Sequence, residues 1–334
     1  MNPRPYLLVL LFLALAAGLS IAVGSVFIPP ADLWRVLTGR PPEQVAQATV
    51  IILTLRLPRT LLIALTGAAL GGSGAAYQGV FRNPLADPYL IGVASGAGLG
   101  AVAAMSLRWP YSPLGLLAVP AAAFLGALLT VFLVYFLARV GKVVPTTNLI
   151  LAGVAVSAFA SALTSFLMLR STGELHRAVA WLLGGSTIAG WKPALIILPY
   201  LTIGLGLLVL SGHALNLLQF GDEQAAQMGL PVTRAKTVIL LAASLTTAAA
   251  VAFSGVIGFI GLILPHVMRL WFGPDYRRLL PLAALGGAGA LLVADVLARL
   301  ILRPQELPVG LVTAVAGAPF FLWVLRRAKN QGYW

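Results

Sequence analysis

The 334-residue sequence contains no cysteine, three histidines and only nine acidic residues. Without cysteine it has no disulfides, no thiolate chemistry and no cysteine-ligated metal site. The three histidines are far apart in the sequence, and no residues show the spacing of a metal site or of a nucleophile with its base. A GxxxxGK[ST] phosphate loop is also absent, so any ATP hydrolysis that the protein uses must come from another chain. We therefore expect neither a catalytic centre nor a bound metal or cofactor on this chain.

Charged residues are scarce as well. They make up 9% of the chain, against 60% hydrophobic residues, whereas a typical soluble domain has about 25% charged residues. The net charge of +13 comes mainly from Lys and Arg at the ends of apolar runs, which predicts contact with lipid headgroups and no binding of nucleic acid. The first apolar run is too long for the core of a signal peptide, so we expect an uncleaved first span.

Apolar stretches dominate what is present. A membrane-crossing helix needs about 20 residues, so a chain of this length can hold about ten. The sequence predicts one all-α polytopic membrane domain over residues 1–334, with its amino terminus inside the cell. The expected spans cover residues 6–28, 59–80, 89–107, 114–138, 146–169, 193–210, 235–255, 259–271, 279–302 and 311–325.

One polar interval, residues 212–236, separates the apolar blocks of the two halves. Its sequence, GHALNLLQFGDEQAAQMGLPVTRAK, mixes carboxylates and amides with small apolar residues. Gly221 and the Gly229–Pro231 run break it into two short helices, because glycine frees the backbone and proline removes a donor. A polar pair of helices on the inner face is suited to docking a soluble partner; an ordinary solvated connector is the alternative.

The two halves resemble each other. RTLLIALTGAALGGSGAAYQGV, from Arg59, is echoed by RAKTVILLAASLTTAAAVAFSGV, from Arg234. LGALLTVFLVYFLAR, ending at Arg139, is echoed by LGGAGALLVADVLAR, ending at Arg299. In the expected topology the copies cross the membrane in opposite directions, so spans 2–5 and 7–10 are predicted to form an inverted repeat of the kind found in transporters. Chance similarity between apolar segments is the alternative.

Several motifs occur in an order and spacing that resemble one family. They are RLPRT, RNPLADP followed by LIGVASGAGLGA, LAGVA, WLLGGS, GDEQAAQMGLP, SGVIGFIGLILPHVMR, ADVLAR and ELPVGLVTAVAGAPFFLWVL. The chain is similar over nearly its whole length to the membrane permeases of ATP-binding-cassette (ABC) importers for cobalamin, haem and ferric siderophores. The resemblance implies a homodimeric ten-helix permease in the cytoplasmic membrane of a bacterium or archaeon. It also implies two cytoplasmic ATPases, which bind ATP and Mg²⁺, and a substrate-binding protein outside.

The resemblance carries roles to particular residues. The ATPase-coupling residues would be Asp222, Glu223, Ala226, Gly229 and Leu230, although the carboxylates could equally cap a helix. The binding-protein docking residues would be Arg56, Arg59 and Arg299, since an arginine fork holds a carboxylate firmly. Headgroup anchoring is the alternative for these arginines, and for Arg299 a local pair with Asp295, four residues earlier.

A cytoplasmic gate is also implied, made of Asn83, Leu85, Thr146 and Thr147, for which turn and N-cap roles are the alternative. Ser157, Ser161 and Ser165 fall four residues apart on one helix face and are candidates to line the pathway. Hydroxyls in membrane helices also bond their own backbone, which is the competing interpretation.

Two other functions fit parts of the sequence. A transporter driven by a proton or sodium gradient would use Asp295 or His266 as a relay, because ionisable residues within spans are costly and often functional. A membrane receptor or scaffold would only dock a partner. The order of the motifs favours the ABC importer, and the sequence leaves the identity of the chelate open.

Overall fold

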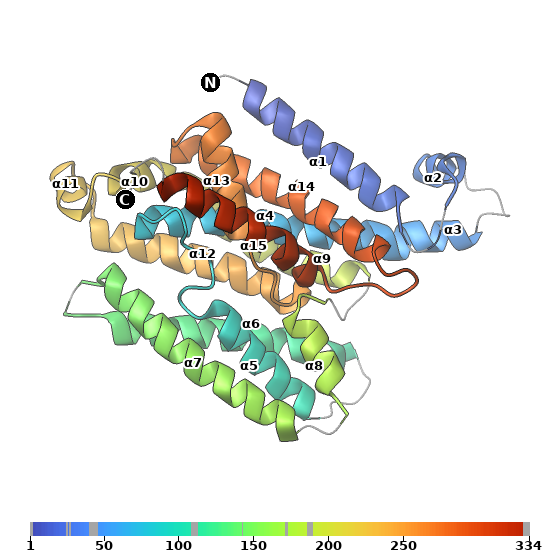
Figure 1. Ribbon diagram of the computed structural model, residues 1–334, viewed down its shortest axis with the longest axis horizontal. Helices are drawn as coiled ribbons and strands as arrows, with labels where there is room; N and C mark the ends of the chain where they lie inside the picture. The colour runs from blue at the N-terminus through green and yellow to red at the C-terminus, as the bar shows by residue number, and fades with distance from the viewer. Residues whose placement is uncertain are drawn as a thin grey trace.

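The computed structural model describes residues 3–24, 26, 28–39, 46–107, 113–141, 143–170, 173–185 and 190–329. This part of the chain is almost wholly helical (Figure 1). Seven helices, or helical stretches, are long and apolar enough to cross a membrane. They belong to α1 (Arg4–Ala22), α4 (Leu57–Phe81), α6 (Pro113–Ala138), α7 (Thr146–Arg170), α9 (Trp191–Leu210), α12 (Val232–Ser254) and α14 (Tyr276–Leu300).

Three further apolar helices bring the number within the described residues to ten, the number that the sequence predicts. They are α5 (Val93–Ser106), α13 (Ile260–Phe272) and α15 (Val309–Lys329). Short helices lie at the two ends of the bundle: α2 (Pro30–Leu37) and α3 (Ala46–Val50) at one end, α10 (Gly212–Leu218) and α11 (Asp222–Gln227) at the other (Figure 1). The remaining short helix is α8 (Leu175–Leu182). In the topology expected from the sequence, the α10–α11 end faces the cytoplasm.

Helix α4 is the centre of the bundle, and glycines allow its neighbours to approach closely. A Cβ on Gly67 would lie 2.3 Å from the Gly287 carbonyl oxygen of α14, and one on Gly74 would lie 1.9 Å from that of Gly261 in α13. Small residues let membrane helices pack backbone against backbone, where dispersion forces and lipid release hold them together. Gly67 and Gly74 therefore allow α14 and α13 to lie directly against α4.

The inverted repeat is visible in the direction of the helices. Helix α4 begins at the α3 end of the molecule, and α12 begins at the opposite end, beside α11 (Figure 1). Each is followed by an irregular segment and then a short helix, α5 or α13, of 14 and 13 residues. The residues that precede these short helices, Gly92 and Phe259, both have positive φ angles, of 84° and 69°. Interrupted helices at matching places in two halves are typical of transporters.

The two interruptions touch one another. The Tyr89 hydroxyl donates to the Ile257 carbonyl oxygen at 2.9 Å and lies 3.2 Å from the Ile257 nitrogen. Unwound backbone at membrane depth needs such partners, because lipid offers no hydrogen bonds. The expected span over 89–107 is therefore shorter than predicted: residues 89–92 are not helical, and α5 begins only at Val93.

Two other expected boundaries are wrong for physical reasons. The first span ends at Ala22 rather than residue 28, because Val23 is extended. The second span begins well before residue 59, since α3 continues through a π-helical segment, Ile51–Arg56, directly into α4. Pro58 lies just after that segment, and a proline inside a helix removes a backbone donor, which favours local rewinding of this kind.

Candidate functional site

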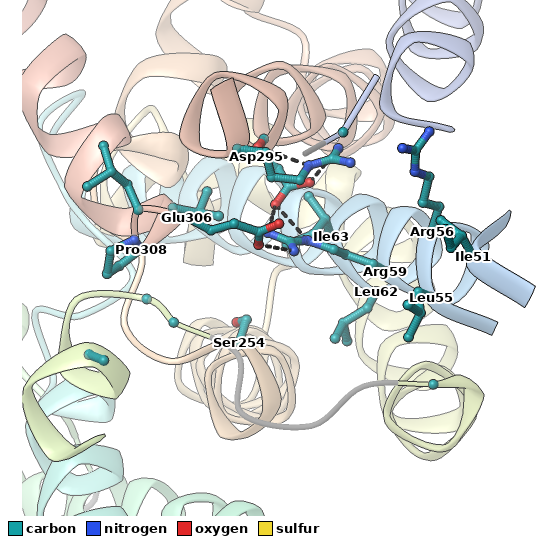
Figure 2. Close-up of a pocket in the computed structure, with 18 of the residues that line it drawn as sticks. Ile51, Leu55, Arg56, Arg59, Leu62, Ile63, Ser254, Asp295, Glu306 and Pro308 are labelled. Atoms are coloured by element: carbon teal, nitrogen blue, oxygen red, sulfur yellow. Dashed lines mark hydrogen bonds and ion pairs between the residues drawn. The ribbon is translucent and has the colours of Figure 1, made fainter. Parts of the chain in front are cut away.

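A cavity of about 530 Å³ opens at the end of the bundle where α2 and α3 lie (Figure 2). Apolar side chains of α4 and of the segment before it form part of its wall, including Leu55 and Leu62. Ser254 at the end of α12 and Gly184 after α8 contribute small residues. The wall also carries three guanidinium groups and two carboxylates: Arg56, Arg59, Arg299, Asp295 and Glu306. An apolar cavity with a few convergent charged groups is the usual form of a binding site.

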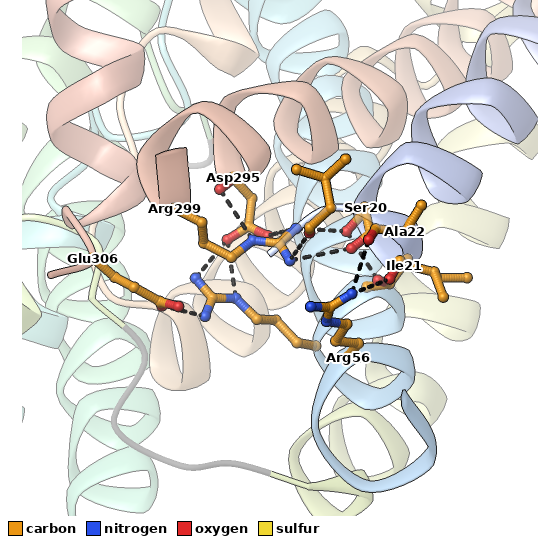
Figure 3. Close-up of polar contacts among 10 residues, drawn as sticks. Ser20, Ile21, Ala22, Arg56, Asp295, Arg299 and Glu306 are labelled. Atoms are coloured by element: carbon orange, nitrogen blue, oxygen red, sulfur yellow. Dashed lines mark hydrogen bonds and ion pairs between the residues drawn. The ribbon is translucent and has the colours of Figure 1, made fainter. Parts of the chain in front are cut away.

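Two of these arginines hold the end of α1 (Figure 3). Arg56 Nη1 donates to the carbonyl oxygens of Ile21 and Ala22, each at 2.9 Å. Arg299 Nη1 donates to the carbonyl oxygens of Ser20 and Val23, at 3.1 and 2.8 Å. The last carbonyls of a helix have no partner within the helix, and cations are favoured there by the helix dipole. These guanidiniums therefore satisfy the end of α1 and fix it to the bundle.

Asp295 is the centre of the charge cluster. Its side chain is 0% exposed, and its Oδ1 accepts from Nε and Nη2 of Arg59 at 3.0 and 2.8 Å. Its Oδ2 lies 2.9 Å from Arg299 Nη2, an ion pair that lacks hydrogen-bond geometry. The local pair with Arg299 predicted from the i,i+4 spacing is confirmed, but the sequence did not predict Arg59 as the second partner.

Glu306 completes the cluster from the segment before α15. Its Oε2 accepts from Arg59 Nη1 at 2.5 Å. The Arg59 and Glu306 side chains are 34% and 37% exposed, so this pair faces the open side of the cavity. By contrast, Arg56 and Arg299 are buried residues, 6% and 3% exposed. The structure thus brings the three predicted docking arginines together and leaves Arg59 the most accessible of them.

No hydrogen bond or ion pair joins His266 to Asp295 in the part of the chain that the structure describes. Asp295 is instead held between two guanidiniums, which is the arrangement of a structural ion pair. A buried charge needs such pairing to offset its lost hydration. This geometry disfavours the relay interpretation. The described residues contain no group of three or more His, Asp or Glu placed to hold a metal ion.

At the opposite end, α10 and α11 form the predicted pair of short helices. Asp222 begins α11, and its Oδ2 accepts from Lys236 Nζ of α12 at 2.6 Å. Glu223, Ala226 and Gly229 are exposed, and Leu230 is partly buried. Gly229 has a φ of 87°, and no atom of the described residues beyond its chain neighbours lies within 4 Å of the position that a Cβ would take. The turn therefore requires glycine here because of its backbone conformation.

Hydrogen bonds join α10 to the spans. Asn216 Nδ2 donates to Asp275 Oδ1 at 2.6 Å, and Asn216 Oδ1 accepts from the Tyr276 backbone nitrogen at 2.8 Å. Gln219 Nε2 donates to the Gly79 carbonyl oxygen at 3.1 Å. The α10 helix is therefore fastened to the beginning of α14 and the end of α4. The sequence interpretation missed Asn216 and Gln219. They are three residues apart, which places both amides on one face of a helix, and this spacing could have indicated a polar contact.

The proposed gate residues occupy the same end. Asn83 Oδ1 accepts from the Leu85 backbone nitrogen at 2.9 Å, which is the local turn anticipated as the alternative. Thr146 and Thr147 begin α7. No hydrogen bond joins the two pairs among the described residues, so within one chain the gate stays a prediction.

Along α7 the three serines behave differently. Ser165 Oγ donates to the Ser161 carbonyl oxygen at 3.0 Å, which is backbone bonding within the helix. Ser157 Oγ accepts from Ser95 Oγ of α5 at 3.1 Å, so this residue joins two helices. Pathway lining by the three residues stays a prediction.

Polar pairs within the membrane core were not predicted. Tyr77 and Ser244 hydroxyls lie 2.9 Å apart, and Thr247 Oγ1 donates to Ser73 Oγ at 3.0 Å, both between α4 and α12. Gln78 Oε1 accepts from Arg269 Nη2 at 3.0 Å, which joins α4 to α13. These contacts link the two halves of the repeat, and each spans more than 160 sequence positions.

Known transport proteins are similar to this chain in sequence and in fold. A permease for cobalamin import from Halobacterium salinarum is 46% identical over 279 residues, covering 84% of this chain and 74% of its own length. The hemin transport permease of Yersinia pestis is 41% identical, covering 97% of this chain and 95% of its own length. An inward-facing structure of a metal-chelate type ABC transporter superposes with a TM-score of 0.83 and 31% identity, over 98% of this chain and 99% of that one. The model of the FecCD transport family matches residues 8–327, so this chain belongs to the FecCD transport family.

Proposed function

We propose that this protein is the membrane permease of an ATP-driven importer whose cargo is a bulky metal chelate of the cobalamin, haem or ferric siderophore class. The observations that carry the proposal are the sequence likeness to permeases named for cobalamin and hemin and the fold likeness, over nearly the whole chain, to a metal-chelate type ABC transporter. Broken helices at matching positions of two inverted halves support it, because they are typical of transporters that work by alternating access.

The proposal assigns partners to the two ends of the bundle. Two copies of the chain form the permease, two cytoplasmic ATPase subunits bind α10 and α11, and an extracytoplasmic binding protein docks at the cavity. The exposed residues Glu223, Ala226 and Gly229 support the inner assignment. Asp222 instead orients α11 through Lys236.

Arg59 is the candidate for docking the binding protein, because it combines partial exposure with a rigidly positioned guanidinium. The burial of Arg56 and Arg299 favours a supporting role for both. Arg56 holds the end of α1, and Arg299 holds that end together with Asp295, the partner of Arg59. A partner carboxylate bound by an arginine fork would make charge-assisted bonds of defined direction.

Uptake into proteoliposomes tests the function. The chain, its ATPase and its binding protein are reconstituted, and cobalamin, haem and a ferric siderophore are offered separately, with and without ATP. We expect ATP-dependent accumulation of one of the three, which would also identify the cargo. Uptake that is independent of ATP and is abolished by collapsing an ion gradient would contradict the proposal and restore the gradient-driven alternative.

A further inference from the structure

Arg59 is already occupied by two carboxylates, and these differ sharply in accessibility. Asp295, 0% exposed, binds the Nε and Nη2 edge and is shared with Arg299. Glu306, whose side chain is 37% exposed, binds the remaining nitrogen, Nη1. Figure 2 shows Glu306 and Asp295 meeting Arg59 from different elements, the segment before α15 and helix α14.

The two contacts also differ in how easily they can be exchanged. Removing Asp295 from Arg59 would leave a buried charge without a partner, which is strongly unfavourable. The pair with Glu306 is partly hydrated, and ion pairs of that kind contribute little because water replaces either partner at small cost. Glu306 is therefore the ligand of Arg59 that an incoming carboxylate can displace.

We propose that Glu306 occupies the docking face of Arg59 in the free permease and gives way to a carboxylate of the binding protein. This inference rests on the proposed docking role of Arg59. The exchange replaces one carboxylate by another on Nη1 of Arg59. The number of carboxylates that Arg59 binds therefore stays the same when the partner arrives. Glu306 lowers the affinity for the binding protein and makes its release easier after cargo has been delivered.

The experiment measures binding of the substrate-binding protein encoded with this permease. The permease is held in nanodiscs together with its ATPase. Glu306→Gln removes the competing charge and is expected to tighten binding about two- to fivefold, the range of an exposed ion pair. Glu174→Gln is the matched control, because the Glu174 side chain is 34% exposed, forms a long ion pair with Arg177, at 3.6 Å, and does not belong to the cavity wall. Equal tightening by both variants would mean a general charge effect and would overturn the proposal.

Arg59→Lys separates this proposal from the docking assignment on which it rests. Lysine keeps the charge beside Asp295 but lacks the fork that holds a second carboxylate. We expect weaker binding, and no tightening when Glu306→Gln is added. If Arg59→Lys leaves binding unchanged, the docking site itself is wrong. If it weakens binding but Glu306→Gln alone does not tighten it, only the competition by Glu306 is refuted.

A second measurement needs no partner. Phenylglyoxal modifies accessible guanidinium groups, and mass spectrometry can follow the reaction at Arg59. Glu306→Gln is expected to raise the rate at Arg59 severalfold, whereas Glu174→Gln leaves it unchanged. An unaltered rate in Glu306→Gln would show that Glu306 does not cover Arg59, and would contradict the proposal.

Discussion

Single residues set how closely the helices approach, and Gly74 of α4 is the tightest example. A Cβ added there would lie 1.9 Å from the Gly261 carbonyl oxygen and 2.6 Å from its Cα, which are backbone atoms that cannot turn aside. Gly74→Ala is expected to push α13 away from α4 and to destabilise the fold by about 1–3 kcal/mol, the usual cost of overpacking. Thermal unfolding of the purified protein in nanodiscs measures the change.

The matched control is Gly206→Ala in α9. This glycine is exposed, and nothing lies within 4 Å of the position that its Cβ would take. Alanine there should be neutral or slightly stabilising, because glycine costs a helix about 0.5–1 kcal/mol. Equal destabilisation by both substitutions would show that the contact with Gly261 is not the reason.

Asp275 shows how one charge stabilises the end of the bundle where α10 and α11 lie. The hydrogen bond from Asn216 lowers the pKa of this exposed carboxyl below its ordinary value, and the Arg277 backbone hydrogen bond and nearby arginines add to the effect. A lowered folded-state pKa means that the charged form stabilises the fold. That contribution is complete above the unfolded pKa of about 4 and is lost as the pH falls through the folded pKa.

Asp275→Asn should therefore lower the free energy of unfolding at pH 7 by less than about 1 kcal/mol, because solvent screens this exposed charge. The melting temperature should fall by a correspondingly small amount. The difference from the wild type should shrink as the pH falls below about 4. Asp32→Asn is the control, since the ion pair of Asp32 with Arg35 is long, at 3.5 Å, and the Arg35 side chain is 55% exposed. A difference independent of pH would contradict the role assigned to the charge.

At the scale of elements, the short helix α11 has one side that no described part of the chain covers. Ala226 is exposed there, while Ala225 is 0% exposed against the bundle. Ala226→Arg should therefore leave the spans folded, because arginine is a good helix former, but should weaken ATPase binding at least tenfold by blocking close approach. Copurification of the ATPase and ATP-driven uptake are the measurements, and unchanged binding would place the coupling surface elsewhere.

Gly229 is a weaker test of the same surface. Its φ of 87° means that any side chain would strain the turn regardless of the ATPase. A loss of ATPase binding in Gly229→Arg could therefore come from a strained turn or from a blocked interface. The sequence did not reveal the positive φ that causes this ambiguity. Substitution at Ala226 avoids this difficulty, because the residue is helical.

Across the whole molecule, the two inverted halves meet along α4 and α12, and α1 lies outside the repeat against α14 (Figure 1). The arginines that fasten α1 come from both halves: Arg56 precedes α4, and Arg299 lies near the end of α14. At this end, the carbonyl oxygens of α1 are thus joined to both halves of the repeat through arginine side chains. A partner that engages Arg59 would bind next to this junction, because Arg59 shares Asp295 with Arg299.

The number of spans, the two short helices and the repeat were predictable because each depends on local apolar length and pattern. The pair of Asp295 with Arg299 was predictable for the same reason, since its residues are four apart. The partnership of Asp295 with Arg59 was not, because 236 positions separate them and only packing makes them neighbours. Likewise, the burial of Arg56 depends on the carbonyls that α1 brings to it. Sequence thus determines which segments cross the membrane, and tertiary packing decides which of the charged residues stay accessible.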